Sequence, residues 1–124
     1  SIDKDRKLQK QDKLTDTELE SLRSKAGQLL WLARQSRPDI LFDVCCLESN
    51  IKSATVQQIL DANKIVRKAK LDNVSLKYCN LGNDSSVHIV AFTDASLGNL
   101  SDGATQGGNF IMLVGKNGSF SPLT

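Results

Sequence analysis

The 124-residue chain has little of what builds metal centres and covalent cross-links: three cysteines and one histidine. Cys45 and Cys46 are adjacent, Cys79 stands apart, and no C-x-x-C pair occurs. An odd cysteine count without that spacing argues against both a disulfide framework and a zinc site. Reduced thiols are typical of proteins in a reducing compartment, so we expect an intracellular location in the cytoplasm or nucleus.

Long apolar runs and a strong charge of one sign are also missing. No stretch has the length of a membrane span or the form of a signal peptide, so no membrane partner is expected. The net charge of +2 does not by itself indicate a nucleic-acid binder. Residues 1–70 carry 14 Lys+Arg and 10 Asp+Glu, whereas residues 71–124 carry 2 and 4. This charge distribution suits an N-terminal part that binds phosphate and a C-terminal part that holds metal-binding carboxylates. A charge difference this small also arises easily by chance.

The first half of the chain predicts helices. Residues 1–13 are mostly charged side chains and glutamine, which predicts a linker or disordered tail. Thr15 and Glu18 then stand at the spacing of a capping box, and apolar residues recur at helical spacing as far as Arg37. The expected buried stripe of this helix consists of Leu19, Leu22, Ala26, Leu29, Leu30 and Ala33.

Two further helices are expected before the pattern changes. Pro38 disfavours helix in the residue before it and suits the first turn of a second helix, which ends near Asn50. Thr55 and Gln58 form another capping-box pattern and begin a third helix, whose apolar residues continue to Ala69.

The second half of the chain predicts strands. Alternation over residues 74–78 predicts a short half-buried strand, and the nearly continuous apolar run 87–92 predicts a strand covered on both faces. Residues 96–108 hold four of the eight glycines and predict a long loop. Further strands are expected at 110–114 and from Phe120. Three helices followed by strands predict an α+β fold.

Asp94 is the sharpest candidate for chemistry. Its carboxylate follows an apolar strand and precedes small residues, so it is placed to hold a divalent cation near a substrate backbone. A turn-forming aspartate at a strand end is the alternative and the commoner role. His88 lies within the same apolar strand, which favours a core or interface histidine over a catalytic one. The segment 103–108 lacks the spacing of a phosphate-binding loop and is expected to be a hairpin loop.

Basic side chains gather on the third helix at Lys64, Arg67 and Lys68. They are candidates for binding the phosphates of a nucleic acid, and a solvated helix face would explain them equally well. Trp31 stands among leucines in the first helix, which favours a place in the core over a base-stacking role.

Four segments together resemble the Pol polyprotein of copia-type retrotransposons. Residues 28–33 (QLLWLA), followed by Arg37-Pro38-Asp39-Ile40, resemble a segment C-terminal to the palm of the reverse transcriptase. Residues 65–70 (IVRKAK) are similar to its downstream I-L-R-Y-L-K helix. Residues 90–96 (VAFTDAS) and 106–113 resemble the first two strands of the fused RNase H. The R-P-D-I segment is the most specific of the four, and the resemblance covers about residues 14–124.

The resemblance implies a domain division and a chemistry. Residues 14–80 would be a thumb-like or connection segment of the reverse transcriptase, and 81–124 the first part of an RNase H-like domain that begins with a β-hairpin. The parent protein of this transposable element would copy RNA into DNA and cleave RNA in RNA/DNA hybrids with Mg²⁺ or Mn²⁺. Asp94 matches the first catalytic, metal-binding carboxylate, while the later ones and the paired aspartates of the polymerase are not in this sequence.

Two expectations follow about the chain by itself. Most catalytic carboxylates are missing, so we expect it to be inactive as an enzyme. The alternative is a domesticated, non-catalytic module that binds nucleic acid or protein through its helices. A hairpin without its later partners would also leave an open apolar edge, which favours self-association.

Overall fold

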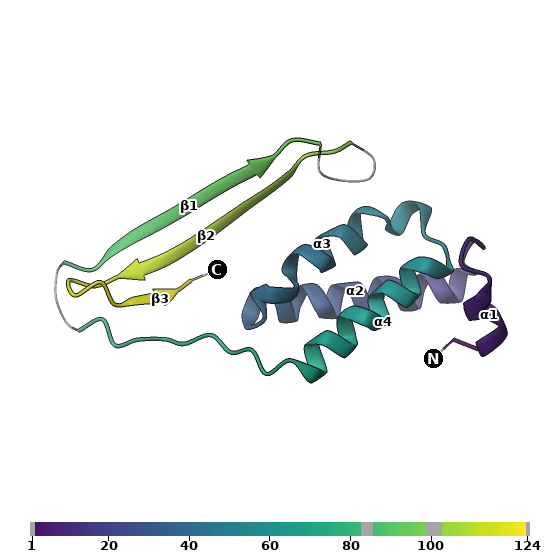
Figure 1. Ribbon diagram of the computed structural model, residues 1–124, viewed down its shortest axis with the longest axis horizontal. Coiled ribbons are helices and arrows are strands. Elements are labelled where there is room, and N and C mark those ends of the chain that lie inside the picture. The colour runs from purple at the N-terminus through teal and green to yellow at the C-terminus, as the bar shows by residue number, and fades with distance from the viewer. Residues whose placement is uncertain (1, 83–85, 99–102, 124) are drawn as a thin grey trace. The chain divides into compact units, whose positions relative to one another are not determined.

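A computed structural model describes residues 2–82, 86–98 and 103–123 of the chain (Figure 1). The fold is α+β, with the helices first and a three-stranded antiparallel sheet after them, as predicted. The chain divides into a helical unit, Ser1–Ser75, and a sheet unit, Leu76–Thr124. The boundary expected from the sequence was near residue 80. Within the described ranges, no helix is both long and apolar enough to cross a membrane.

The helical unit packs three helices around one core (Figure 1). Its elements are α1 (Lys4–Leu8), α2 (Asp16–Gln35), the 3-10 turn η1 (Pro38–Ile40), α3 (Leu41–Ser49), the 3-10 turn η2 (Ile51–Ser53) and α4 (Val56–Leu71). The largest fully buried side chains are Ile40, Val44 and Val56. The second helix therefore starts with a 3-10 turn at Pro38, and its regular part begins at Leu41.

Helix α2 begins as the sequence predicted. The Glu18 N–H donates to Thr15 Oγ1 at 3.3 Å, and the Thr15 N–H donates to Glu18 Oε2 at 2.9 Å, which closes the capping box. Four residues of the expected stripe are fully buried, and two at its edges are half-buried. The buried ones are Leu22, Ala26, Leu29 and Ala33. Regular spacing of apolar residues thus gives α2 a single buried face.

The N-terminal segment differs from the linker or disordered tail that its composition predicted. It contains α1, and its chain then runs beside the start of α4. The carbonyl of Asp12 accepts from the Val56 N–H at 3.0 Å, and the carbonyl of Lys10 accepts from the Gln57 N–H at 3.0 Å. The first N–H groups of a helix lack partners within the helix, so this segment supplies partners for α4. We call residues 10–13 the N-terminal strap.

The sheet unit is an antiparallel meander in the order β1-β2-β3. Its strands are β1 (His88–Ser96), β2 (Gln106–Val114) and β3 (Phe120–Pro122). Residue pairing runs from His88 opposite Val114 to Ser96 opposite Gln106. A turn joins β2 to β3: the Gly115 N–H donates to the Ser119 carbonyl at 2.8 Å, and Gly118 has a φ of 75° that suits glycine.

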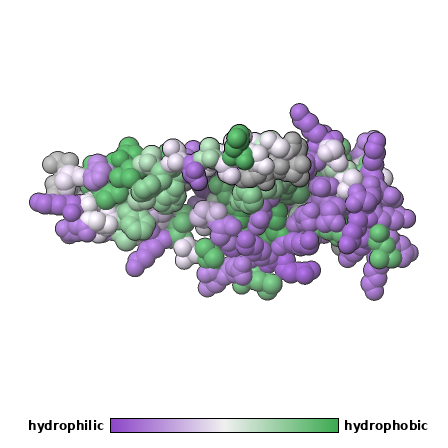
Figure 2. Space-filling view, turned by 45° about the horizontal axis from the view of Figure 1, so that its top comes forward, coloured by the Kyte–Doolittle hydropathy of each residue, from purple (hydrophilic) through white to green (hydrophobic). Residues whose placement is uncertain are grey.

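Two expectations about strands were wrong. Residues 74–78 form no strand, although the nearby Cys79 is tied to β3 by two hydrogen bonds with the Ser121 hydroxyl, at 2.9 and 3.0 Å. The strand over 87–92 is not covered on both faces, since Ile89 is 67% exposed and Phe92 60% exposed. Figure 2 shows hydrophobic residues of the sheet unit at the molecular surface.

The long loop expected over 96–108 is shorter than predicted. Strand β1 continues to Ser96 and β2 already begins at Gln106, because extended backbone pairs across residues 106–108 despite their glycines. The candidate hairpin loop 103–108 is therefore partly strand. Residues 83–85 and 99–102 lie outside the described residues.

Candidate functional site

Asp94 lies inside β1 and not beyond its end. It pairs with Gly108 on β2 and is exposed. Side chains two residues apart on a strand share a face, so Asp94 stands on the same face as Phe92 and Ser96. The glycine opposite has no side chain, and a Cβ built there would meet no atom within 4 Å. The carboxylate therefore faces open space beside bare backbone, where a bulky ligand could approach it.

The described residues do not complete a metal centre around Asp94. Across residues 2–82, 86–98 and 103–123, no three Asp, Glu, His or Cys side chains gather where they could hold an ion. A site for Mg²⁺ or Mn²⁺ of the two-metal kind needs several carboxylate oxygens, and Asp94 supplies one side chain. These residues therefore do not fit a two-metal site, and no cleavage step is assigned to them.

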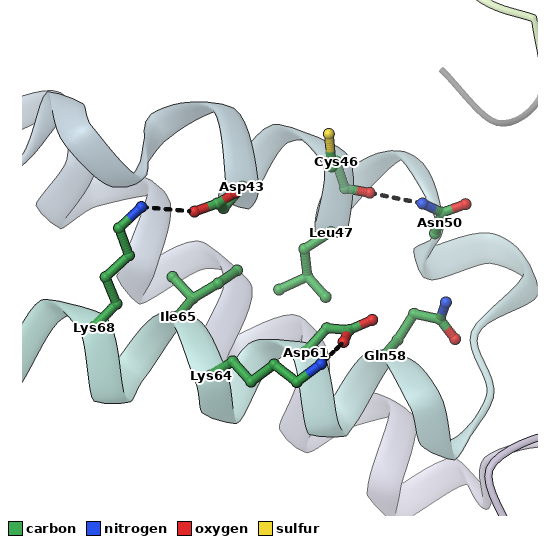
Figure 3. Close-up of a pocket in the computed structure, with 9 residues that line it drawn as sticks. All are labelled: Asp43, Cys46, Leu47, Asn50, Gln58, Asp61, Lys64, Ile65 and Lys68. Carbon is green, nitrogen blue, oxygen red and sulfur yellow. Dashed lines mark hydrogen bonds and ion pairs between the residues drawn. The ribbon is translucent and has the colours of Figure 1, made fainter. Parts of the chain in front are cut away.

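The predicted basic cluster on α4 is divided by its ion pairs (Figure 3). Lys64 Nζ lies 3.2 Å from Asp61 Oδ1, and Lys68 Nζ lies 3.1 Å from Asp43 Oδ2 on α3. Arg67 is exposed, and none of the described side chains forms an ion pair with it. Two of the three predicted phosphate ligands are thus already paired with carboxylates. Their positive charge is largely balanced locally.

Lys64 and Lys68 border a groove of about 350 Å³ between α3 and α4, which we call the α3/α4 groove (Figure 3). Its wall includes Cys46, whose pKa is raised by burial and by the nearby Asp43 carboxylate. A raised pKa keeps the thiol protonated at neutral pH, and the thiolate is the nucleophilic form. With two lysines and two aspartates, the groove offers neither an activated nucleophile nor a net charge.

The Arg37-Pro38-Asp39-Ile40 segment has a structural role that the sequence did not reveal. Arg37 is only 7% exposed. Its Nε and Nη2 donate to the two Asp39 carboxylate oxygens at 2.9 Å each, and its Nη1 donates to the Ala69 carbonyl at 2.6 Å. Hydrogen bonding to Arg37 lowers the pKa of Asp39 below its ordinary value. Arg37 thereby connects the α2–α3 junction to the last turn of α4.

Trp31 and His88 both lie outside the core. Trp31 is 67% exposed, because its position on α2 is nearly opposite the buried stripe. The expectation that Trp31 lies in the core was wrong. The leucines next to it in the sequence lie on other faces of the helix. His88 is exposed at the start of β1, with Nδ1 3.1 Å from the Ser86 carbonyl. It is neither buried nor close to Asp94 in the strand register.

Comparison with protein-family models found no match to this chain, and comparisons with curated proteins and with solved structures found none either. Function is therefore inferred from the chain's own residues and their geometry.

Proposed function

We propose that this chain is part of a copia-type retrotransposon Pol protein, in which the helical unit belongs to the end of the reverse transcriptase and the sheet unit to the start of the RNase H. The observation that carries the proposal is the position of Asp94. It stands within the first strand of a three-stranded antiparallel meander, and the resemblance implies a catalytic carboxylate near that place.

The proposed role of the chain by itself is non-catalytic. It contributes one carboxylate, and the remaining acids of the nuclease would come from residues outside the described part. A hybrid-cleavage assay with Mg²⁺ or Mn²⁺ tests this role directly, and we expect no cleavage above background. Metal-dependent cleavage that the Asp94→Asn variant abolishes would show that the chain by itself is a nuclease.

The gene provides the test of family membership. A Pol protein should encode the paired aspartates of a polymerase upstream of residue 1, and a helix of the S-T-x-x-A-E-T type with its glutamate downstream of residue 124. Sequencing the surrounding reading frame decides this point. A frame that contains neither motif would contradict the proposed family, whatever the chain binds.

The proposed partner of the intact protein is an RNA/DNA hybrid, and Arg67 is its best contact in the helical unit. Removing one side chain that binds a phosphate should lower the slope of log affinity against log salt by about one. We expect Arg67→Ala to show this change in fluorescence anisotropy with labelled hybrid. Because Lys64 and Lys68 are already paired with aspartates, their alanine variants should change the slope less.

Lys52→Ala is the matched control, because Lys52 is an exposed lysine of η2 and does not belong to the basic cluster. If Arg67→Ala and Lys52→Ala leave the slope equally unchanged, the basic cluster is a solvated helix face. The hybrid would then contact another part of the protein.

A further inference from the structure

A second groove lies between α2 and α4 and differs in character from the α3/α4 groove. This α2/α4 groove has a volume of about 340 Å³. Its floor is aliphatic and its rim carries two lysines. The floor consists of Leu29, Leu32, Val66 and Ala69, and the remaining lining residues are Lys25, Gln28 and Lys70. Leu29 is fully buried, whereas the other three floor residues are half-buried and accessible from outside.

Polar contacts hold α2 and α4 together on both sides of this groove. Near the end of both helices, Arg37 Nη1 donates to the Ala69 carbonyl at 2.6 Å. Further toward their start, Lys25 Nζ donates to Asn63 Oδ1 at 3.0 Å. These contacts join like ends of α2 and α4, so the two helices run in the same direction. The groove is therefore preformed, and a ligand would not have to separate the helices.

The charge of the α2/α4 groove is positive and unbalanced. Its lining contains no carboxylate, and none of the described residues forms an ion pair with Lys25 or Lys70. In the α3/α4 groove, by contrast, Asp43 and Asp61 offset both lysines. Arg67 lies three residues before Lys70 on α4, so it adds a third positive charge beside the rim.

We propose that the α2/α4 groove binds an acidic amphipathic helix of a partner protein. Aliphatic side chains of that helix would fill the floor, and Asp or Glu residues beside them would meet Lys25 and Lys70. An aliphatic floor without an aromatic side chain offers no stacking surface for a base, so it favours a protein over a nucleic acid. This interaction is independent of membership in the Pol family.

Nuclear magnetic resonance on the full ¹⁵N-labelled chain tests the proposal. The probe is a synthetic helical peptide with leucines at positions i, i+3, i+4 and i+7 and glutamates at the remaining positions. We expect its addition to shift the amides of the groove residues and to leave those of the α3/α4 groove unchanged. The same leucine pattern with lysines in place of the glutamates should bind far more weakly.

Two groove variants and one control sharpen the test. Lys70→Glu should weaken binding of the glutamate peptide by about tenfold, because it replaces an attraction with a repulsion. Leu32→Gln should also weaken binding by removing part of the apolar floor. Lys52→Glu makes the same charge change outside the groove and should leave binding unchanged. Circular dichroism confirms that each variant keeps its helices.

Four outcomes would overturn the proposal. The first is the absence of groove shifts at about 1 mM peptide, which would mean a dissociation constant well above about 1 mM. The second is equal binding of the lysine peptide. The third is that an RNA/DNA hybrid shifts the same groove amides and displaces the peptide, which would make the groove a nucleic-acid site. The fourth is a groove already filled by a second copy of the chain, seen as shifts that depend on protein concentration without peptide.

Discussion

Arg37 connects separate parts of the helical unit through polar contacts. Its planar guanidinium forms two parallel bonds with Asp39 and a third with the Ala69 carbonyl. Such a fork fits a carboxylate in a way that a lysine ammonium does not. The last carbonyls of α4 also lack partners within the helix, so the third bond satisfies a group that burial would otherwise penalise.

We therefore expect Arg37→Ala to lower the midpoint of thermal unfolding clearly, by leaving the partly buried Asp39 carboxylate and the Ala69 carbonyl without their donor. Arg37→Lys should recover only a small part of the loss. Arg34→Ala is the control, because Arg34 is exposed in the last turn of α2, three residues before Arg37. Differential scanning calorimetry measures all three. Equal midpoints for the Arg37 and Arg34 variants would contradict the structural role of Arg37.

Glu18 takes part in both the ion pair with Arg6 and the capping box of α2, and its ionisation should make the stability of the chain depend on pH. Its carboxylate accepts from Arg6 Nε at 3.2 Å and Nη2 at 3.1 Å, and it also closes the capping box with Thr15. Hydrogen bonds from Arg6, followed by that from the Thr15 backbone, lower the pKa of Glu18 from 4.5 to about 2. A depressed pKa means that the folded state favours the ionised form.

The contribution of Glu18 to stability is complete above pH 4.5 and is lost as the pH falls through about 2. Titration of the Glu18 carboxyl by nuclear magnetic resonance should show a midpoint near the lower value. Arg6→Gln should move that midpoint back up, because the largest cause of the shift is removed. A Glu18 midpoint that is the same in the wild type and in Arg6→Gln would contradict this assignment.

At the scale of elements, the N-terminal strap is the least expected feature. Composition predicted a linker or disordered tail, because charged residues and glutamine bury little apolar surface. The N-terminal segment is held mainly by polar contacts: Asp12 and Lys10 carbonyls to the first turn of α4, and Arg6 to Glu18. Sequence patterns based on hydrophobic spacing do not register contacts of this kind.

Removing residues 1–13 should therefore destabilise α4 and not merely shorten the chain. The Val56 and Gln57 amides would no longer have their acceptors and would become exposed to solvent. Hydrogen exchange should show both amides protected in the full chain and fast in the truncated one, while the Ile65 amide in the middle of α4 serves as internal reference. If both amides keep the same protection in the truncated chain, residues 1–13 do not support α4 and act as the linker or tail that their composition predicted.

At the scale of the whole molecule, the two units differ in how well they cover apolar side chains. The helical unit encloses its core, whereas β1 is an edge strand with Ile89 and Phe92 exposed. Open edge strands pair readily with other chains, and among the described residues of β1 one side chain, Asp94, carries a formal charge. The self-association expected from the sequence therefore remains our prediction for the chain by itself.

Sedimentation velocity over a wide concentration range should show reversible association of the full chain. Ile89→Lys places a charge in the exposed part of β1 and should reduce association strongly. Leu97→Lys is the matched control, since Leu97 is also exposed but follows the end of β1. A monomer at all concentrations, or equal effects of both variants, would show that the β1 edge is not the contact.

The sequence by itself determined the three longer helices, the capping box that begins α2, and the α+β order. Capping residues and apolar periodicity act within a few residues of each other, so Thr15, Glu18 and the stripe of α2 could be predicted directly. The approximate place of Asp94 near the first long strand followed from the same local logic. The exposure of the strands could not be predicted in this way, because an apolar run has the same sequence whether or not another layer covers it.

Only the tertiary structure decided which polar side chains meet. Arg37 donates a hydrogen bond to the Ala69 carbonyl 32 residues away in the sequence, and Lys68 donates one to the Asp43 carboxylate 25 residues away. These contacts depend on how three helices pack, and no local pattern encodes that packing. The same packing separated two grooves on α4, one with its lysines balanced by aspartates and one with its lysines unbalanced. Charge on a helix can be counted from sequence, but its neutralisation depends on which helix lies beside it.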